Sequence, residues 1–113
     1  MMTVPLVLFG AAALGGLIMA IVRFSGKPQP PFAIAIIHGL AAALGLILLI
    51  AAVSKSGGGS ATVALGLFVV AALGGFALFA QHLRKVALSI PLMVAHACLA
   101  VLGFVVLLVN ALG

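Results

Sequence analysis

Two histidines in equivalent surroundings are the residues whose type and spacing point most directly to chemistry. Each of them, His38 and His96, is followed by an alanine four residues later and a glycine seven residues later. Positions i, i+4 and i+7 share one face of a helix, so each imidazole would stand at one end of a stripe of small residues. Imidazole is the commonest metal ligand among side chains. The pair is therefore a candidate site for a metal or a metal cofactor.

The chain contains no Asp and no Glu among its 113 residues, which excludes most other chemistry. Carboxylate sites for Mg²⁺ or Ca²⁺, glycosidase carboxylate pairs and Asp-oriented catalytic triads all need an acid. Membrane transporters usually rely on a buried acid as well, so a transporter is the least favoured function. The five Lys and Arg residues are scattered and make no basic stripe, so we expect no nucleic-acid partner.

The composition places the histidines in a membrane protein. The chain is 67% apolar and 4% charged, whereas a soluble domain carries about 25% charged residues. A membrane-spanning helix needs about 20 mostly apolar residues. Four apolar runs have this character, at residues 4–22, 32–53, 61–80 and 90–112. The first run lacks the basic start of a signal peptide, so we interpret it as a helix. The sequence predicts an all-α integral membrane protein, a four-transmembrane-helix up-down bundle that forms one transmembrane domain in the lipid bilayer.

The two halves of the chain are copies of each other. Residues 8–16 match residues 67–75 at an offset of 59, with seven of nine residues identical, and the offset becomes 58 after the following turn. The repeats comprise residues 4–53 and 61–112, joined by a flexible Ser/Gly loop at 54–60. Each repeat is a two-helix hairpin, so both copies have the same orientation and a pseudo-two-fold axis should run along the membrane normal.

The basic residues indicate an orientation in the membrane. Four of them lie in the first and third connections: Arg23, Lys27, Arg84 and Lys85. Lys55 alone lies in the second connection. The positive-inside rule then places the basic turns in the cytoplasm and both termini outside, as in a bacterial inner-membrane protein. The offset of 58 pairs Lys27 with Lys85. We interpret His82 as part of the solvated cationic end, with proton exchange near a quinone as the lesser alternative.

The depth of the histidines suggests what they hold. His38 lies seven residues after Pro31, about 10 Å into the bilayer from the cytoplasmic side at 1.5 Å per residue. Two glycine pairs come to the same level: Gly15, Gly16, Gly74 and Gly75. If helices 32–53 and 90–112 lie on a diagonal, their axes are about 13 Å apart, which two imidazoles and one iron would fill. This geometry suits a haem with two axial histidines. The glycines would admit the porphyrin edges, and the four clustered cations would bind the propionates.

These residues resemble the haem-binding four-helix core of membrane cytochrome b proteins. In that family, histidines on the second and fourth helices ligate haem and glycines on the first and third make room. This chain lacks the second histidine on each ligating helix. The resemblance therefore implies one b-type haem near the cytoplasmic face, ligated by His38 and His96. It implies an electron carrier or a subunit of a larger redox complex, exchanging electrons with a partner subunit or quinol, more than a stand-alone enzyme.

Other interpretations of the same residues stay open. The histidines could form a structural polar pair, or they could bind a chlorophyll-type pigment or a quinone. Ala12 with Gly16 and Ala71 with Gly75 are small-x3-small patterns that often serve only helix packing. The chain would then be a non-catalytic accessory subunit that associates with other membrane subunits or as a homo-oligomer. Cys98 cannot form an internal disulfide and is expected to be a small packing residue.

Overall fold

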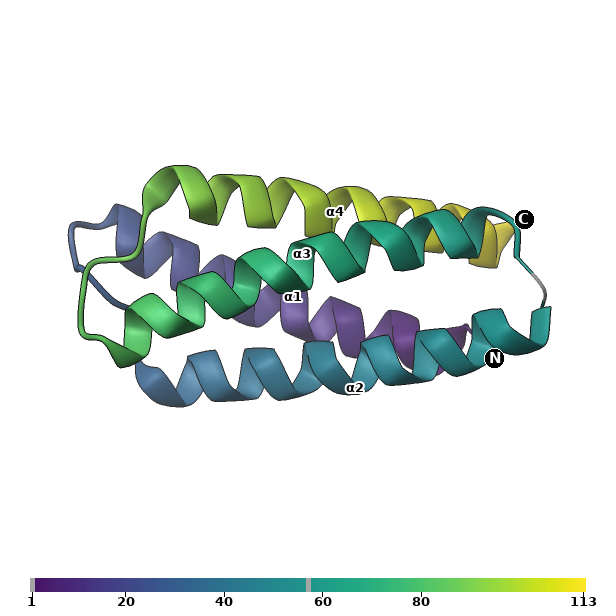
Figure 1. The fold of residues 1–113 in the computed structure, drawn as a ribbon, viewed down its shortest axis with the longest axis horizontal. Coiled ribbons are helices and arrows are strands. Elements are labelled where there is room, and N and C mark those ends of the chain that lie inside the picture. Colours follow the sequence, from purple (N-terminus) through teal and green to yellow (C-terminus); the bar gives the residue numbers. More distant parts are fainter. Residues whose placement is uncertain (1, 57) are drawn as a thin grey trace.

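The computed structural model describes residues 2–56 and 58–113 and forms four helices. They are α1 (Thr3–Phe24), α2 (Phe32–Ser56), α3 (Ser60–Leu83) and α4 (Ile90–Leu112). Each is long and apolar enough to cross a membrane, and the described residues contain no strand. The helices run up and down in one bundle (Figure 1). The predicted all-α, four-transmembrane-helix bundle is confirmed.

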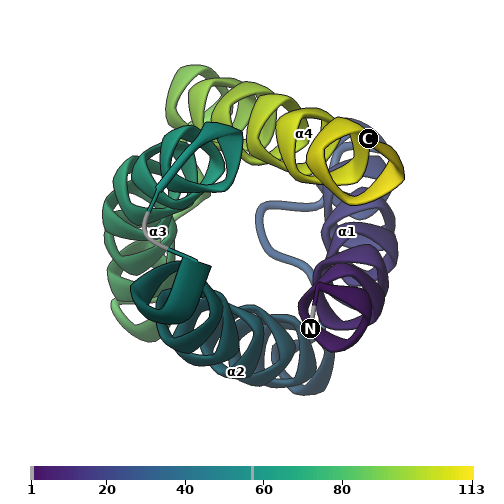
Figure 2. The same cartoon turned by 90° about the vertical axis from the view of Figure 1, so that its right-hand side faces the viewer.

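The four helices form a square in which sequence neighbours lie side by side. α1 packs on α2 and α3 on α4, and the square is closed by contacts of α2 with α3 and of α1 with α4. α2 therefore faces α4 across the centre, and α1 faces α3 (Figure 2). The predicted diagonal of the two histidine-bearing helices is the arrangement that the bundle adopts.

The helix ends differ from the predicted spans by a few residues. α4 begins and ends as predicted, whereas α2 continues to Ser56 and α3 begins at Ser60. Nothing in residues 54–56 breaks a helix, so the loop predicted at 54–60 is shorter. Gly58 and Gly59 have φ of 130° and 83°, which other residues rarely adopt, and they turn the chain into α3.

Each helix presents a stripe of buried side chains, small and large, to the centre of the bundle. On α3 the buried positions recur at spacings of three, four or seven residues: Ala61, Ala64, Phe68, Ala71, Leu78 and His82. This spacing is typical of helices in a bundle with a shared seam. The large aliphatic side chains lie mostly on the outside, as Leu73 and Val101 do, which suits a surface that faces lipid.

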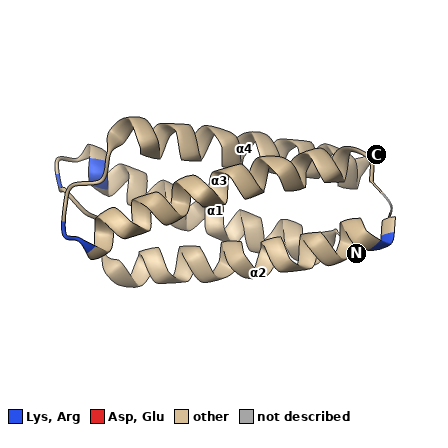
Figure 3. Cartoon of the chain, viewed as in Figure 1, with Lys and Arg blue, Asp and Glu red and all other residues tan. Residues whose placement is uncertain are grey.

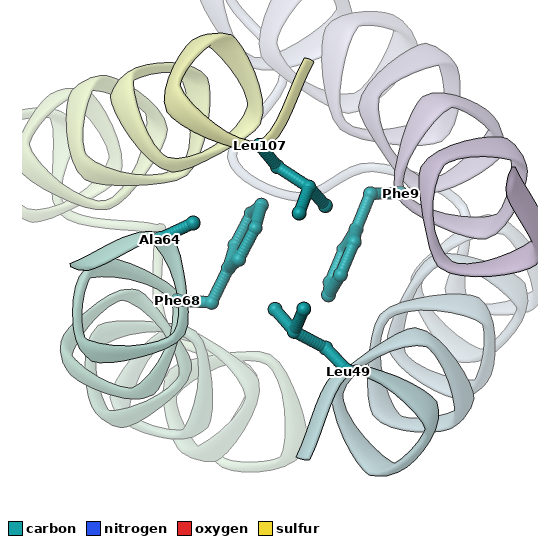
Figure 4. Packing of buried hydrophobic residues seen from close by; sticks show 5 residues of the cluster. All are labelled: Phe9, Leu49, Ala64, Phe68 and Leu107. Atoms are coloured by element: carbon teal, nitrogen blue, oxygen red, sulfur yellow. The ribbon is translucent and has the colours of Figure 1, made fainter. Parts of the chain in front are cut away.

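The end of the bundle that holds the termini is filled by an aromatic layer. Phe9 of α1 and Phe68 of α3 stack face to face with ring centroids 3.9 Å apart and planes 4° apart. Leu49 and Leu107 close the layer from the other diagonal and are fully buried (Figure 4). A side chain at Gly45 would meet the Phe9 ring at 3.3 Å, so glycine there admits the ring. Equivalent residues of the two repeats thus make equivalent contacts about the central axis.

The opposite end is covered by the two basic connections, which bind each other. Arg23 donates its Nε–H to the Leu88 carbonyl over 3.0 Å. The Leu88 amide donates to the Pro28 carbonyl over 3.1 Å. Gln29 donates from Nε2 to the Val86 carbonyl over 2.7 Å. These bonds join residues far apart in the sequence, and they hold most of the cations together at one end of the bundle (Figure 3).

The turns after α1 and α3 correct one detail of the repeat. Ser25 and Arg84 are the equivalent C-caps, and the next residues, Gly26 and Lys85, both have positive φ, of 107° and 57°. Lys85 thus takes the place of Gly26 and not that of Lys27, with which the offset of 58 paired it. The one-residue deletion falls after Lys85, since a helix C-terminus commonly ends on a left-handed residue.

Candidate functional site

Both intramembrane histidines hydrogen-bond to a backbone carbonyl of the neighbouring helix. His38 Nδ1 lies 2.7 Å from the Ala12 oxygen, and His96 Nδ1 lies 2.6 Å from the Ala71 oxygen. A carbonyl oxygen only accepts, so Nδ1 must carry the proton in both rings. In a neutral imidazole the lone pair is then on Nε2. Both histidines are held in the tautomer that leaves Nε2 free to bind a ligand.

The two rings meet across the centre of the bundle. Their centroids are 6.2 Å apart and their planes are inclined at 78°, although the helices that carry them lie on a diagonal. Two metal–nitrogen bonds of about 2 Å each would take up about 4 Å of such a distance, and two ring radii would take up the rest. The separation suits one metal ion between the two rings. The bundle thus brings together the two residues predicted as metal ligands.

The glycine pairs lie against the imidazole rings of their own hairpin. A Cβ at Gly16 would come within 3.2 Å of His38 Cε1, and one at Gly75 within 3.1 Å of His96 Cε1. At Gly15 and Gly74 the nearest atoms would be the Cβ atoms of the same histidines, at 3.4 and 3.5 Å. The glycines therefore make room for the rings. Their predicted contact with porphyrin edges stays a prediction.

Each ring bonds to an alanine carbonyl that is left uncovered by a glycine one turn further along the same helix. A side chain at position i+4 of a helix lies near the carbonyl of residue i. Because Gly16 has no side chain, the Ala12 carbonyl is open to His38, and Gly75 opens Ala71 in the same way. The sequence alone predicted helix packing or cofactor space for these small-x3-small pairs. Their role as imidazole acceptors was missed, although the repetition of the pair opposite each histidine was a usable signal.

Within residues 2–56 and 58–113, the bundle interior offers candidate metal ligands at one level only, that of His38 and His96. The described residues contain no group of three or more His, Cys, Asp or Glu that could bind a metal, so the protein offers two ligands and a macrocycle would have to supply the others. Gly45, which faces the Phe9 ring, lies seven residues after His38, about 10 Å further along the helix. The aromatic layer therefore fills the interior beyond the histidines.

The prediction for His82 is wrong. Its side chain is only 8% exposed, and its ring lies edge-on to Phe32 with centroids 5.3 Å apart. The cause is its position on the interior stripe of α3, four residues after the buried Leu78. With its neighbours it lines a hollow of about 290 Å³ between the start of α2 and the end of α3, whose lining is Gln29, Phe32, His82, Leu83 and Lys85.

Cys98 and Asn110 are two further polar or reactive residues on α4. Cys98 was expected to pack against other residues, but it is exposed, because it lies two residues after His96 and faces away from the centre. Asn110 donates from Nδ2 to the Ser60 hydroxyl over 2.8 Å, which ties the end of α4 to the start of α3. Neither residue belongs to the histidine layer.

The predicted propionate ligands lie at the basic end of the bundle, beyond the histidine layer. Arg23 is held there by the Leu88 carbonyl, and Lys27, Arg84 and Lys85 are exposed. The described residues offer them no carboxylate partner, since the chain has no acidic side chain. The fold thus gathers these cations as predicted, and what they bind stays a prediction.

Comparisons of the chain with protein-family models, with curated proteins and with solved structures find no match. The resemblance to cytochrome b cores therefore stays a prediction from the sequence alone. Chemically, the arrangement provides two imidazoles that are oriented by hydrogen bonds inside an apolar bundle. Most of the cations lie at the nearer end of that bundle.

Proposed function

We propose that this protein is a small membrane cytochrome that carries one b-type haem between His38 and His96. The observation that supports the proposal best is the pair of Nδ1–H hydrogen bonds to the Ala12 and Ala71 carbonyls. They leave both Nε2 atoms free while the ring centroids lie 6.2 Å apart. An accepting group behind a metal-bound histidine fixes its orientation and strengthens it as a donor.

The chain's own residues would set the properties of the haem. Two histidine ligands, a low-dielectric surrounding and hydrogen bonds to the ligands are the factors through which a protein tunes a haem potential. Haem would supply one-electron chemistry when bound. The aromatic layer of Phe9, Phe68, Leu49 and Leu107 occupies the interior beyond the site, which favours a single haem.

The basic end supports both the position of the haem and its orientation. Its propionates would extend toward Arg23, Lys27, Arg84 and Lys85, which meet no acidic side chain in this chain. By the positive-inside rule this end faces the cytoplasm and both termini face outward, in a bacterial inner membrane. A quinol or a partner subunit would exchange electrons with the haem, in a larger redox complex or a homo-oligomer.

A visible absorption spectrum of the protein purified in detergent tests the proposal. We expect a red protein with sharp reduced-minus-oxidised bands, and we expect His38→Ala and His96→Ala each to lose them. Cys98→Ser is the matched control, because this exposed residue lies on the same helix two positions from His96. A colourless protein, or alanine variants with an unchanged spectrum, would overturn the proposal. A colourless protein that copurifies with a large assembly would instead indicate an accessory subunit.

A further inference from the structure

The two repeats differ where the basic end meets the membrane. At the end of α3, His82 stands where α1 has Arg23, and at the start of α2, Phe32 stands where α4 has Ile90. The core contacts of the two hairpins are equivalent, so this difference is local to the seam between α2 and α3. One of the two seams therefore carries an imidazole and an aromatic ring at the helix ends beside the basic connections.

The hollow at this seam is lined by a buried imidazole, that of His82. His82 is more than nine-tenths buried, and among the described residues its carbonyl, but not its ring, has a hydrogen-bond partner in Gln29. In the part of the chain that the structure describes, every polar side-chain atom that is fully covered has a hydrogen-bond partner. A ring nitrogen without a partner is therefore not fully covered. The ring nitrogens of His82 therefore remain accessible from the hollow that the residue lines.

Lys85 lines the same hollow from a strained backbone position. Its φ is 57°, in the left-handed region, where the other hairpin has Gly26. A residue with a Cβ is disfavoured there, and glycine is the usual choice. A cation therefore occupies a position where the fold alone would favour glycine.

The chemistry of the hollow defines its occupant. Lys85 offers an ammonium group, His82 offers a ring nitrogen, and no acidic side chain exists in the chain to compete for them. Phe32 and Leu83 supply apolar walls and are 47% and 59% exposed on the outside of the bundle. An anion with an attached hydrocarbon chain matches both features, and the bilayer contains such molecules in its anionic phospholipids.

We propose that the hollow between α2 and α3 binds the phosphate group of one anionic phospholipid. Lys85 and His82 contact the phosphate, and Phe32 and Leu83 contact the first part of an acyl chain. This inference goes beyond the proposed haem and stands without it, because the hollow lies at the outer seam of the basic end and the histidine pair lies at the centre of the bundle. Lys85 is the one residue that both proposals name, and the experiment below separates its two roles.

Native mass spectrometry of the full chain in detergent micelles tests the lipid site. Phosphatidylglycerol and phosphatidylcholine with identical acyl chains are the probes, and we expect one phosphatidylglycerol to bind at least tenfold more tightly than phosphatidylcholine. Lys85→Gly should weaken this binding at least tenfold and still fold, because glycine suits the left-handed conformation. His82→Leu should weaken it as well. Lys55→Gly, a cation at the opposite end, is the matched control and should bind as the wild type does.

Three results would overturn the inference. Equal retention of the two lipids would show that the phosphate charge is not recognised, and wild-type binding by Lys85→Gly would show that the hollow is not the site. Displacement of the lipid by millimolar inorganic phosphate would indicate a site for free phosphate. Haem absorbance is recorded on the same samples, so a loss of lipid with normal colour, or the reverse, separates this inference from the proposed function. If the hollow binds a haem propionate instead, Lys85→Gly should lose haem absorbance while its retention of phosphatidylglycerol stays unchanged.

Discussion

His38 donates its Nδ1 proton to the Ala12 carbonyl over 2.7 Å, and this bond joins the second helix to the first inside the membrane. The repeat builds the same bond on the other side of the central axis. The bundle therefore has two layers made by different diagonals, with phenylalanines of α1 and α3 in one and histidines of α2 and α4 in the other. The histidine layer depends on Gly16 and Gly75, where each ring packs against the backbone of the neighbouring helix.

Gly16→Ala and Gly75→Ala should each destabilise the bundle. The added Cβ would come within 3.2 or 3.1 Å of a Cε1 atom, so each ring would have to shift and stretch its short hydrogen bond to the neighbouring helix. Overpacking of this kind costs about 1–3 kcal/mol. The free energy of unfolding in mixed micelles measures the effect.

Gly10→Ala is the matched control for these two glycines, because nothing lies within 4 Å of a Cβ at that position. It should stabilise α1 by about 0.5–1 kcal/mol, the ordinary gain of alanine over glycine inside a helix. If Gly16→Ala were as stabilising as Gly10→Ala, the ring would be free to move, and the tight layer described above would be disproved.

Phe68→Ala should weaken the aromatic layer strongly. Phe68 is 7% exposed and stacks on Phe9, and removal of a buried phenylalanine costs about 3–5 kcal/mol. A double-mutant cycle with Phe9→Ala should show a coupling of about 0.5–1.5 kcal/mol from the stacked rings. Phe76→Ala on the same helix, where the side chain is 71% exposed, should change the free energy of unfolding little. Equal losses for the two α3 variants would contradict the assignment of the interior.

The architecture could be predicted from the sequence because its causes are local and repeated. Apolar runs of about 20 residues define membrane helices, and the His-x3-Ala-x2-Gly spacing places both imidazoles on interior faces. The repeated Ala-x3-Gly pairs hint at the hydrogen bonds to Ala12 and Ala71 but do not fix them, since these bonds depend on how closely α2 approaches α1 and α4 approaches α3. The small residues on both sides of each contact allow that approach, but spacing along one helix says nothing about the partner helix.

His82 and Lys85 illustrate a second reason for missed features. The sequence predicts His82 at the solvated end, because it corresponds to Arg23 in the repeat and lies near Arg84. Its burial follows from the three-and-four spacing of the α3 stripe, which reaches it after Leu78. The offset of 58, which pairs His38 with His96, also pairs Lys27 with Lys85. The backbone pairs Lys85 with Gly26, since the chain there needs a left-handed residue.

Lys85→Gly should raise the free energy of unfolding, although it removes a charge. The left-handed conformation costs a residue with a Cβ about 1–2 kcal/mol, and glycine avoids that penalty at the price of a more flexible unfolded chain. A net gain of about 0.5–1 kcal/mol is expected. Lys27→Gly removes an equally exposed cation that is not at positive φ, and it should be neutral or destabilising. Thermal unfolding of the two variants in one detergent compares them directly, and the same sign for both would refute the strain argument.

Arg23→Lys should loosen the connection between the basic turns while it keeps the charge. The Arg23 Nε–H bond to the Leu88 carbonyl is made by a rigid, planar group, and a flexible ammonium group reproduces such a bond poorly. A loss of about 1 kcal/mol is expected for the missing hydrogen bond. Hydrogen exchange should become faster at the Leu88 amide, which is bonded to Pro28 in the same connection. Unchanged exchange there would mean that charge alone holds the turns.

His38→Met tests the ligand role of the histidine pair more sharply than removal of the ring. If His38 and His96 ligate one haem, methionine can replace one ligand and give the His/Met pair that raises the reduction potential of a cytochrome. The variant should therefore keep its haem, shift its visible bands and titrate at a higher potential than the wild type. His96→Met should behave alike, because the repeat gives both rings the same surroundings. A potential that is unchanged in both variants, in protein that still holds haem, would show that the haem is bound elsewhere in the molecule.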